Sequence, residues 1–350
     1  MTRDTKDALI VTNCGAEAIS FLKVYGVIPA ATAFMVVYSR LANSFSPKSL
    51  FYITLFPFIL FYVAFAFILY PARGLIHPMS LRVPDGGMAY VINLLRHWTF
   101  SLYYIVSELW GSAGVPLLFW TCANDVVKIE EAKRVYPLIS LIGNLGPILS
   151  GIVMSSVSRM VKTSTGGDEE CFEKSLKVLT CIMTASGALV AYLHWHVHNI
   201  NERGRGMEAQ SSKDSSEKST LPKASKPKLS LSESMKVLSS DKYLRNIATM
   251  VVCYGLSIEF TEIIWKSTVK RAFPGKTEYL NFMGRYSTLV GMSSFVMTFV
   301  GSSTVKNLGW KAGALMTPVV MGALGIPFFA SVCTGLKSPK SLFMAVYVGQ

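Results

Sequence analysis

The sequence predicts an all-α, polytopic membrane protein, and three observations support this fold class. Hydrophobic residues make up 51% of the 350 residues and charged residues only 16%, compared with about 25% charged in ordinary soluble domains. The mean hydropathy is +0.39. Apolar runs as long as a transmembrane helix recur along the chain. A series of soluble domains is therefore excluded, and the lipid bilayer is the expected partner of most of the surface.

Eight apolar runs are expected to cross the membrane as helices. The first covers 24–38, and the second, 51–70, contains no charged residue, which makes it the clearest span. The third covers 91–122 and exceeds one membrane thickness, which implies tilt, a kink or a cytosolic extension; the glycines and proline at 111–116 offer a place to bend. The runs that follow are 136–157, 176–197, 244–265, 286–305 and 312–336, and a ninth begins near Ser341.

A polar segment at 201–242 separates these runs into two groups. It is rich in Ser and Lys and includes SSKDSSEKST and PKASKPK, a composition typical of flexible linkers. We therefore predict an N-terminal helical half at 1–200, a flexible linker at 201–242 and a C-terminal helical half at 243–350. Five runs before the linker and an interrupted fourth after it favour a six-plus-six transporter. We expect this chain to lack the first helix of such a transporter and two or three of the last.

The charge of the chain, its cysteines and its missing motifs exclude several classes of function. The net charge of +13 would favour nucleic acid in a soluble protein, but in a membrane protein we expect anionic lipid or an anionic solute and no nucleic acid. The six cysteines form no CxxC pair, so we expect neither a disulfide framework nor a zinc site. Because P-loop, HExxH and GxSxG motifs are absent, we predict neither an enzyme nor a bound cofactor.

Ionisable residues inside the predicted spans are candidates for function, because a charge at the bilayer centre costs about 2.5 to 3.5 kcal/mol. Glu108 lies midway along the third run, where a partner on a neighbouring helix is the simpler alternative. Glu259, Glu262 and Lys266 share one helical face by their spacing. An ordinary Glu262–Lys266 pair explains two of them, whereas a solute cavity would use all three. Arg96 enters the third run, and snorkelling to the interface is its competing explanation.

Two further polar segments also have ordinary explanations. The RDTKD segment at the start of the chain, taken alone, is typical of a charged loop; its ionisable residues are Arg3, Asp4, Lys6 and Asp7. The HWHVH segment places His194 and His198 on one helical face, as a metal site requires, but anchoring at the membrane interface beside Trp195 is the better explanation. No glycine-rich loop can cradle a phosphate, so a phosphorylated solute would need Lys and Arg side chains and helix termini.

The chain resembles the plastid and bacterial-parasite type of ATP/ADP translocases, and not the six-helix mitochondrial carriers. The resemblance runs from Arg3 to Gln350 and rests on several motifs in the same order: RDTKDALIVTNCGAEAISFLKVYGVIPAATAFMVVYSRL, YPARGLIHP, LRHWTFSLYYIVSELWGS, LFWTCAND, EEAKRVYPL, EFTEIIWKS and EYLNFMGRYST. It implies a twelve-helix, major-facilitator-like antiporter that exchanges ATP for ADP plus phosphate.

The resemblance also implies which charged residues are important for transport. Three of the four such positions in the family correspond here to Lys6, Glu108 and Glu262, and the fourth, a lysine in a late helix, falls beyond Gln350. In the mechanism that follows, Lys6, Arg3 and Arg96 meet the phosphate oxygens. Glu108 and Glu262 pair with these cations when the site is empty. An aromatic side chain could stack on adenine, and the candidates are Tyr103, Tyr104 and Trp110.

Three alternatives to ATP/ADP antiport remain open at this point. The same scaffold could carry other nucleotides, it could import nucleotides together with protons through titration of Glu108, or it could be a truncated membrane protein that transports nothing. The location is equally open between two membranes. The Ser/Lys-rich linker favours a eukaryotic protein of the plastid (chloroplast) envelope, and the bacterial inner membrane is the alternative.

Overall fold

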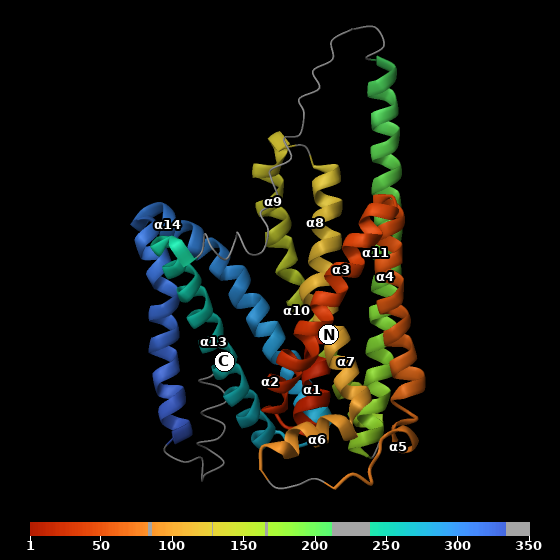
Figure 1. Ribbon diagram of the computed structural model, residues 1–350, viewed down its shortest axis with the longest axis vertical. Helices are drawn as coiled ribbons and strands as arrows, with labels where there is room; N and C mark the ends of the chain where they lie inside the picture. Colours follow the sequence, from red (N-terminus) through yellow and green to blue (C-terminus); the bar gives the residue numbers. More distant parts are fainter. Residues whose placement is uncertain (83–85, 128, 165–166, 212–238, 334–350) are drawn as a thin grey trace. The chain divides into compact units, whose positions relative to one another are not determined.

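The computed structural model describes residues 1–82, 86–127, 129–164, 167–211 and 239–333, and within them every regular element is helical (Figure 1). The predicted all-α fold class is therefore confirmed. The α-helices are α1 (Thr2–Cys14), α2 (Ala18–Phe21), α3 (Ile28–Ser44), α4 (Pro47–Ala64), α5 (Arg73–Ile76), α6 (Met88–Arg96), α7 (Trp98–Leu109), α8 (Val115–Val126), α9 (Ile129–Gly143), α10 (Leu145–Ser164), α11 (Asp168–Ser211), α13 (Lys242–Ala272) and α14 (Lys276–Cys333). Three π-helical segments join some of them: η1 (Leu22–Val27), η2 (Phe65–Leu69) and η3 (Trp110–Gly114).

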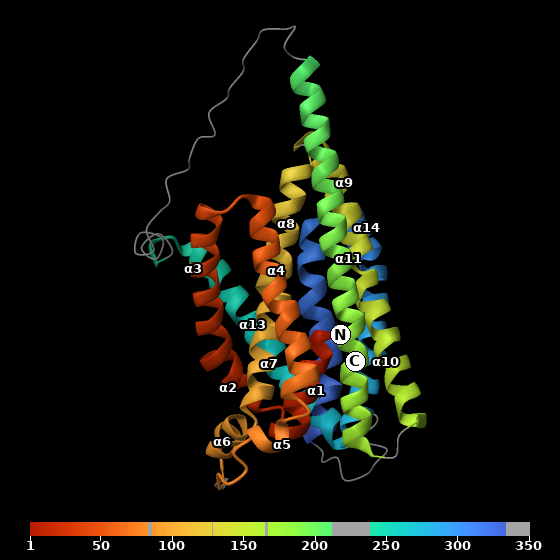
Figure 2. The same ribbon diagram turned by 90° about the vertical axis from the view of Figure 1, so that its right-hand side faces the viewer.

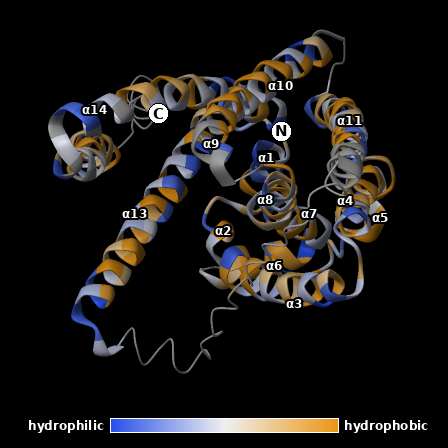
Figure 3. Cartoon of the chain, turned by 90° about the horizontal axis from the view of Figure 1, so that it is seen from above, coloured by the Kyte–Doolittle hydropathy of each residue, from blue (hydrophilic) through white to orange (hydrophobic). Residues whose placement is uncertain are grey.

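Seven helical stretches in the described ranges are long and apolar enough to cross a membrane: Ala18–Ser44, Pro47–Leu69, Trp98–Asn124, Leu141–Lys162, Asp168–Ile200, Lys242–Ala272 and Lys311–Ala330. Many large apolar side chains on these helices are exposed, among them Val36, Leu60, Leu189 and Leu324. Figure 3 shows such hydrophobic residues along the sides of α10 and α13. In a lipid bilayer these surfaces would face acyl chains, which supports an integral, multi-pass membrane protein.

One of the predicted spans differs from the structure. The run at 91–122 is not one helix, because α6 ends at Arg96 and α7 begins at Trp98. His97 lies between them, and its ring Nδ1 is 3.0 Å from the carbonyl oxygen of Asn93. The expected bend further along this run is present as η3, a π-helical turn at Trp110–Gly114. The run at 286–305 is helical within α14, as predicted, although it is not among the seven apolar stretches found in the described residues. The ninth run, at 341–350, lies outside the described residues.

Local sequence explains where several helices begin and end. Ser46 caps α4, its side-chain oxygen accepting a hydrogen bond from the backbone N–H of Ser49, and Pro47 follows at the first helical position. Gly15 ends α1 with a φ of 101°, a conformation that favours glycine. Gly309, with a φ of 82°, interrupts α14 between the predicted runs 286–305 and 312–336. Figure 2 shows α3 beside α4, joined by the turn that Ser46 closes.

The chain forms two compact units. The first consists of Met1–His198 together with the residues from Trp265 onward, and the second is Asn199–Ile264. Helix α11 continues to Ser211, beyond the predicted start of the linker at 201, and residues 212–238 lie outside the described ranges. The predicted division into halves at 1–200 and 243–350 stays a prediction, because the first compact unit contains helices from both.

Small residues allow close packing in the first unit between α10 and the first part of α14. A Cβ atom added at Gly151 would clash with the backbone of Gly284, and one added at Gly291 would lie 2.6 Å from the side chain of Ile148. Such contacts are typical of helices that associate in membranes. Beside this pair, α1 packs against both α7 and α14, so an N-terminal helix contacts elements from either side of the predicted linker.

Candidate functional site

The first helix carries charged residues into the interior of the first unit. All residues from Asp4 to Val11 on α1 are buried, including Lys6 (5% exposed) and Asp7 (1% exposed). The expectation of a charged loop at RDTKD is therefore wrong. These charges tolerate burial because each meets partners on other helices, which is the condition for charged groups in an interior.

Lys6 forms two ion pairs in the interior. Its Nζ lies 2.8 Å from Oε2 of Glu108 on α7 and 3.0 Å from Oδ1 of Asp7. The Glu108 side chain is 25% exposed, the Lys6 side chain 6%. Glu108 lies one residue before the end of α7 and two residues before the π-helical turn η3, a distortion that is frequent at functional sites. The structure thus brings together Lys6 and Glu108, two of the residues that the sequence singled out.

Asp7 joins a second lysine to this pair. Its other oxygen, Oδ2, lies 2.8 Å from Nζ of Lys266 on α13, and both side chains are almost fully buried, at 1% and 4% exposed. The four residues Lys6, Asp7, Glu108 and Lys266 form what we call the buried cluster, in which two positive and two negative charges balance. Asp7 was not singled out from the sequence, and only its position beside Lys6 in RDTKD could have suggested it.

One of the three aromatic candidates lies at the buried cluster. The Nζ of Lys6 lies 4.0 Å from the centre of the Tyr104 ring, a cation–π distance. Tyr103 instead packs among aromatic side chains, with its ring centre 4.3 Å from that of Phe65. Trp110 packs against Phe58 at 5.0 Å. Tyr104 therefore supports the Lys6 ammonium group through its ring face.

Two serine hydroxyl groups form hydrogen bonds between residues near the start of the chain and helices that follow the predicted linker. Ser287 on α14 donates a hydrogen bond of 2.9 Å to Oδ1 of Asp4. Ser267 on α13 donates one of 3.1 Å to Oε1 of Glu17. The buried cluster therefore sits where α1 and α7 meet the end of α13 and the start of α14.

The remaining predicted site residues lie elsewhere. Arg3 is exposed on α1. Arg96, at the end of α6, donates to the carbonyl oxygen of Met79 at 3.3 Å and lies 3.4 Å from its sulfur. Glu262 is partly buried and belongs to the second compact unit. The roles of these three residues stay predictions.

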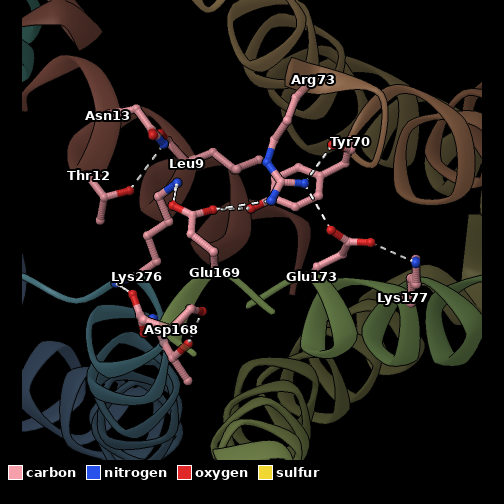
Figure 4. A network of polar contacts seen from close by, with 11 residues as sticks. Leu9, Thr12, Asn13, Tyr70, Arg73, Asp168, Glu169, Glu173, Lys177 and Lys276 are labelled. Carbon is pink, nitrogen blue, oxygen red and sulfur yellow. Dashed lines mark hydrogen bonds and ion pairs between the residues drawn. The ribbon is translucent and has the colours of Figure 1, made fainter. Parts of the chain in front are cut away.

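A second set of ion pairs lies where several helices begin or end, and Figure 4 shows it. Arg73 lies 2.9 Å from Glu173 and 3.5 Å from Glu169, and Lys177 lies 2.9 Å from Glu173. The ammonium group of Lys276, the first residue of α14, also contacts Glu169. We call these residues, which lie on α5, α11 and α14, the helix-end network: Arg73, Glu169, Glu173, Lys177 and Lys276. Asp168 adds a cap to α14, since its carboxylate accepts from the backbone N–H groups of Lys276 and Thr277.

Buried His77 and half-buried His97 lie near Arg73. Nε2 of His77 and Oγ1 of Thr99 are 2.6 Å apart, and the ring centre of His77 lies 5.3 Å from that of His97. Burial lowers the pKa of His77 from 6.5 to about 4, and the positive charges of His97, Arg73 and Lys276 act in the same direction. The His194 ring of HWHVH lies elsewhere and stacks on Phe51 at 3.8 Å.

Comparison with known proteins identifies relatives along the whole chain. The family model described as TLC ATP/ADP transporter matches residues 1–349. ADP,ATP carrier protein 1 of Chlamydia trachomatis is 37% identical over 365 residues, which cover 99% of this chain and 67% of that protein. The chloroplastic ADP,ATP carrier protein 2 of Arabidopsis thaliana is 37% identical over 99% of this chain and 56% of its own length. ADP,ATP carrier protein 3 of Rickettsia bellii is 33% identical over 93% and 66%. The chain thus spans between about half and two thirds of these relatives, and no solved structure matches it.

Proposed function

The chain belongs to the TLC ATP/ADP transporter family, and from this premise we propose that it works as a membrane antiporter that exchanges ATP for ADP plus phosphate by alternating access. The observation that carries the proposal is the ion pair between buried Lys6 and partly exposed Glu108, with 2.8 Å between the charged atoms. The pair joins α1 to α7, and Asp7 beside it contacts Lys266 on α13, which follows the predicted linker. A transporter of this architecture would hold its solute between such elements. The relatives' names, ADP,ATP carrier proteins, give the substrates.

The charges of the buried cluster suit exchange of polyanions. Lys6 would meet phosphate oxygens through charge-assisted hydrogen bonds, with Tyr104 beneath its ammonium group. Glu108 would hold Lys6 while the site is empty and would be displaced by the entering nucleotide. A site that has lost its nucleotide and not regained its carboxylate would keep unpaired positive charge in the membrane, which resists reorientation. Exchange is therefore favoured over one-way leak.

The other predicted residues take supporting roles in this proposal. Arg3 and Arg96 would attract the phosphates as the nucleotide approaches, and Glu262 would pair with a cation of the empty site. Trp110 is half-buried and lies two residues after Glu108 in the sequence, which keeps it a candidate for stacking on adenine. We propose the plastid envelope as the location, with the bacterial inner membrane as the alternative, and imaging of a fluorescent fusion or fractionation would decide.

Uptake into liposomes that contain the purified protein tests this function. We expect labelled ATP to enter only when ADP is present inside, and labelled phosphate inside to leave together with ADP. Uptake that does not depend on internal ADP would contradict antiport. Stimulation by an inward proton gradient would instead favour proton-coupled import through Glu108, equal competition by other nucleotides would broaden the substrate, and no uptake of any nucleotide would favour a protein that does not transport.

A further inference from the structure

We propose that Lys266 is a second phosphate-binding side chain of the nucleotide site, and that Asp7 is the built-in anion that holds Lys6 and Lys266 in place when the site is empty. This inference rests on the proposed function and extends it to substrate choice. It assigns the site to nucleoside diphosphates and triphosphates in preference to monophosphates.

The first step is the geometry of Asp7. Its two carboxylate oxygens contact different ammonium groups, Lys6 at 3.0 Å and Lys266 at 2.8 Å, in surroundings where all three side chains are at most 6% exposed. Two ammonium groups this near one another repel strongly at low dielectric unless an anion lies between them. The interior of the protein therefore holds a pair of cations whose proximity depends on one carboxylate.

The second step is that a polyphosphate presents the same pattern of charge. Neighbouring phosphate groups carry anionic oxygens that can contact two ammonium groups at once, and lysine binds phosphate as a mobile point charge. A diphosphate can therefore replace Asp7 on both lysines. A monophosphate satisfies Lys6 and leaves Lys266 with Asp7.

The third step concerns where the two lysines come from. Lys6 lies on α1 beside α7, whereas Lys266 lies near the end of α13, next to Trp265, whose ring packs on Tyr286 of α14 at 4.5 Å. A ligand that contacts both lysines would bridge elements from before and after the predicted linker. The contacts that distinguish a diphosphate from a monophosphate would therefore be the same contacts that change during alternating access.

Equilibrium binding to the purified protein in nanodiscs tests this inference, with ATP, ADP, AMP and pyrophosphate as ligands. We expect Lys266→Gln to weaken ATP, ADP and pyrophosphate binding at least about tenfold and to leave AMP binding within about twofold. Lys266→Arg, which keeps the charge, should restore most of the affinity. Lys270→Gln, one turn further along α13 and half-buried, is the matched control and should match the unmodified protein.

Asp7→Asn provides a second test, in which ADP binding should become tighter instead of weaker. If Asp7 competes with phosphate, its removal should tighten ADP binding by about tenfold, seen also as a larger ADP-induced rise in melting temperature, even when the empty protein is less stable. A purely structural Asp7–Lys266 pair predicts that both variants weaken all ligands equally, and that result would overturn the inference. Unchanged selectivity for ADP over AMP in a folded Lys266→Gln protein would also overturn the inference. Absence of nucleotide binding by the unmodified protein would instead refute the proposed function itself.

Discussion

The buried cluster and the helix-end network use the same side-chain chemistry in opposite surroundings. Each has a carboxylate that contacts two cations: Asp7 between Lys6 and Lys266, and Glu173 between Arg73 and Lys177. The Asp7 side chain is 1% exposed and that of Glu173 is 24% exposed. Water therefore screens one carboxylate and hardly reaches the other.

Because of this difference in exposure, the ion pairs of the two regions differ in their energetic cost and in their expected function. Exposed ion pairs contribute about 0 to 1 kcal/mol each, so the helix-end network can hold helix ends at little expense. A buried ion pair loses its hydration and often stabilises no more than an apolar packing would. Three charges kept in the interior, those of Lys6, Asp7 and Lys266, are therefore better explained by a task than by stability, and binding of an anionic solute is such a task.

The largest expected effect is on transport, through Lys6. Lys6→Gln removes the cation shared by Asp7 and Glu108, so the nucleotide loses a charged partner in a desolvated site. We expect ATP/ADP exchange in liposomes to fall at least about a hundredfold. Lys177→Gln, in the helix-end network, is the matched control and should retain exchange within about twofold. Similar losses in both variants would remove the functional contrast between the two regions.

The next largest effect is on the stability of the empty protein, through Asp7. Asp7→Asn removes the carboxylate that lies 2.8 Å from Nζ of Lys266, and loss of one partner of a buried pair costs about 3 to 5 kcal/mol. Denaturant unfolding in detergent, followed by the signal of the six tryptophans, would measure this loss. The double variant Asp7→Asn with Lys266→Gln should recover part of it, because no buried charge is then left unpaired. A loss below about 1 kcal/mol would show that water reaches Asp7.

These two regions also show what the sequence could and could not predict. Long uncharged runs such as 51–70 predicted membrane helices correctly, since a helix satisfies its own backbone in lipid. Hydropathy did not predict the burial of α1, because its charged residues give this interior helix the composition of a surface segment. The Asp7–Lys266 pair joins the start of the chain to α13, and no local spacing reveals such a contact. Resemblance to a family pointed to Lys6 and Glu108, but only the fold showed that they touch.

A smaller effect is expected from pH, through His77 beside the helix-end network. Its pKa in the folded protein, about 4, lies below the ordinary value of 6.5, so the folded state takes up its proton less readily than the unfolded chain. Stability is therefore fully present above pH 6.5 and is lost as the pH falls from 6.5 toward about 4. We expect the melting temperature to fall over this window. His77→Gln should flatten the decline, whereas the exposed His196→Gln should not, and an unaltered profile in both would assign the acid sensitivity to other groups.

The smallest effect is expected for Glu173→Gln, the counterpart of Asp7→Asn in the helix-end network. Its partners Arg73 and Lys177 are 24% and 36% exposed, so water takes the place of the lost carboxylate. We expect the free energy of unfolding to fall by about 1 kcal/mol or less, and the difference to shrink further as salt screens the remaining charges. The same denaturant titration that measures Asp7→Asn applies here, at low and high ionic strength. Suppose that Glu173→Gln lowered the free energy of unfolding as much as Asp7→Asn at both salt concentrations. Burial would then not be what distinguishes the two regions, and the argument that the buried cluster is kept for binding would lose its physical basis.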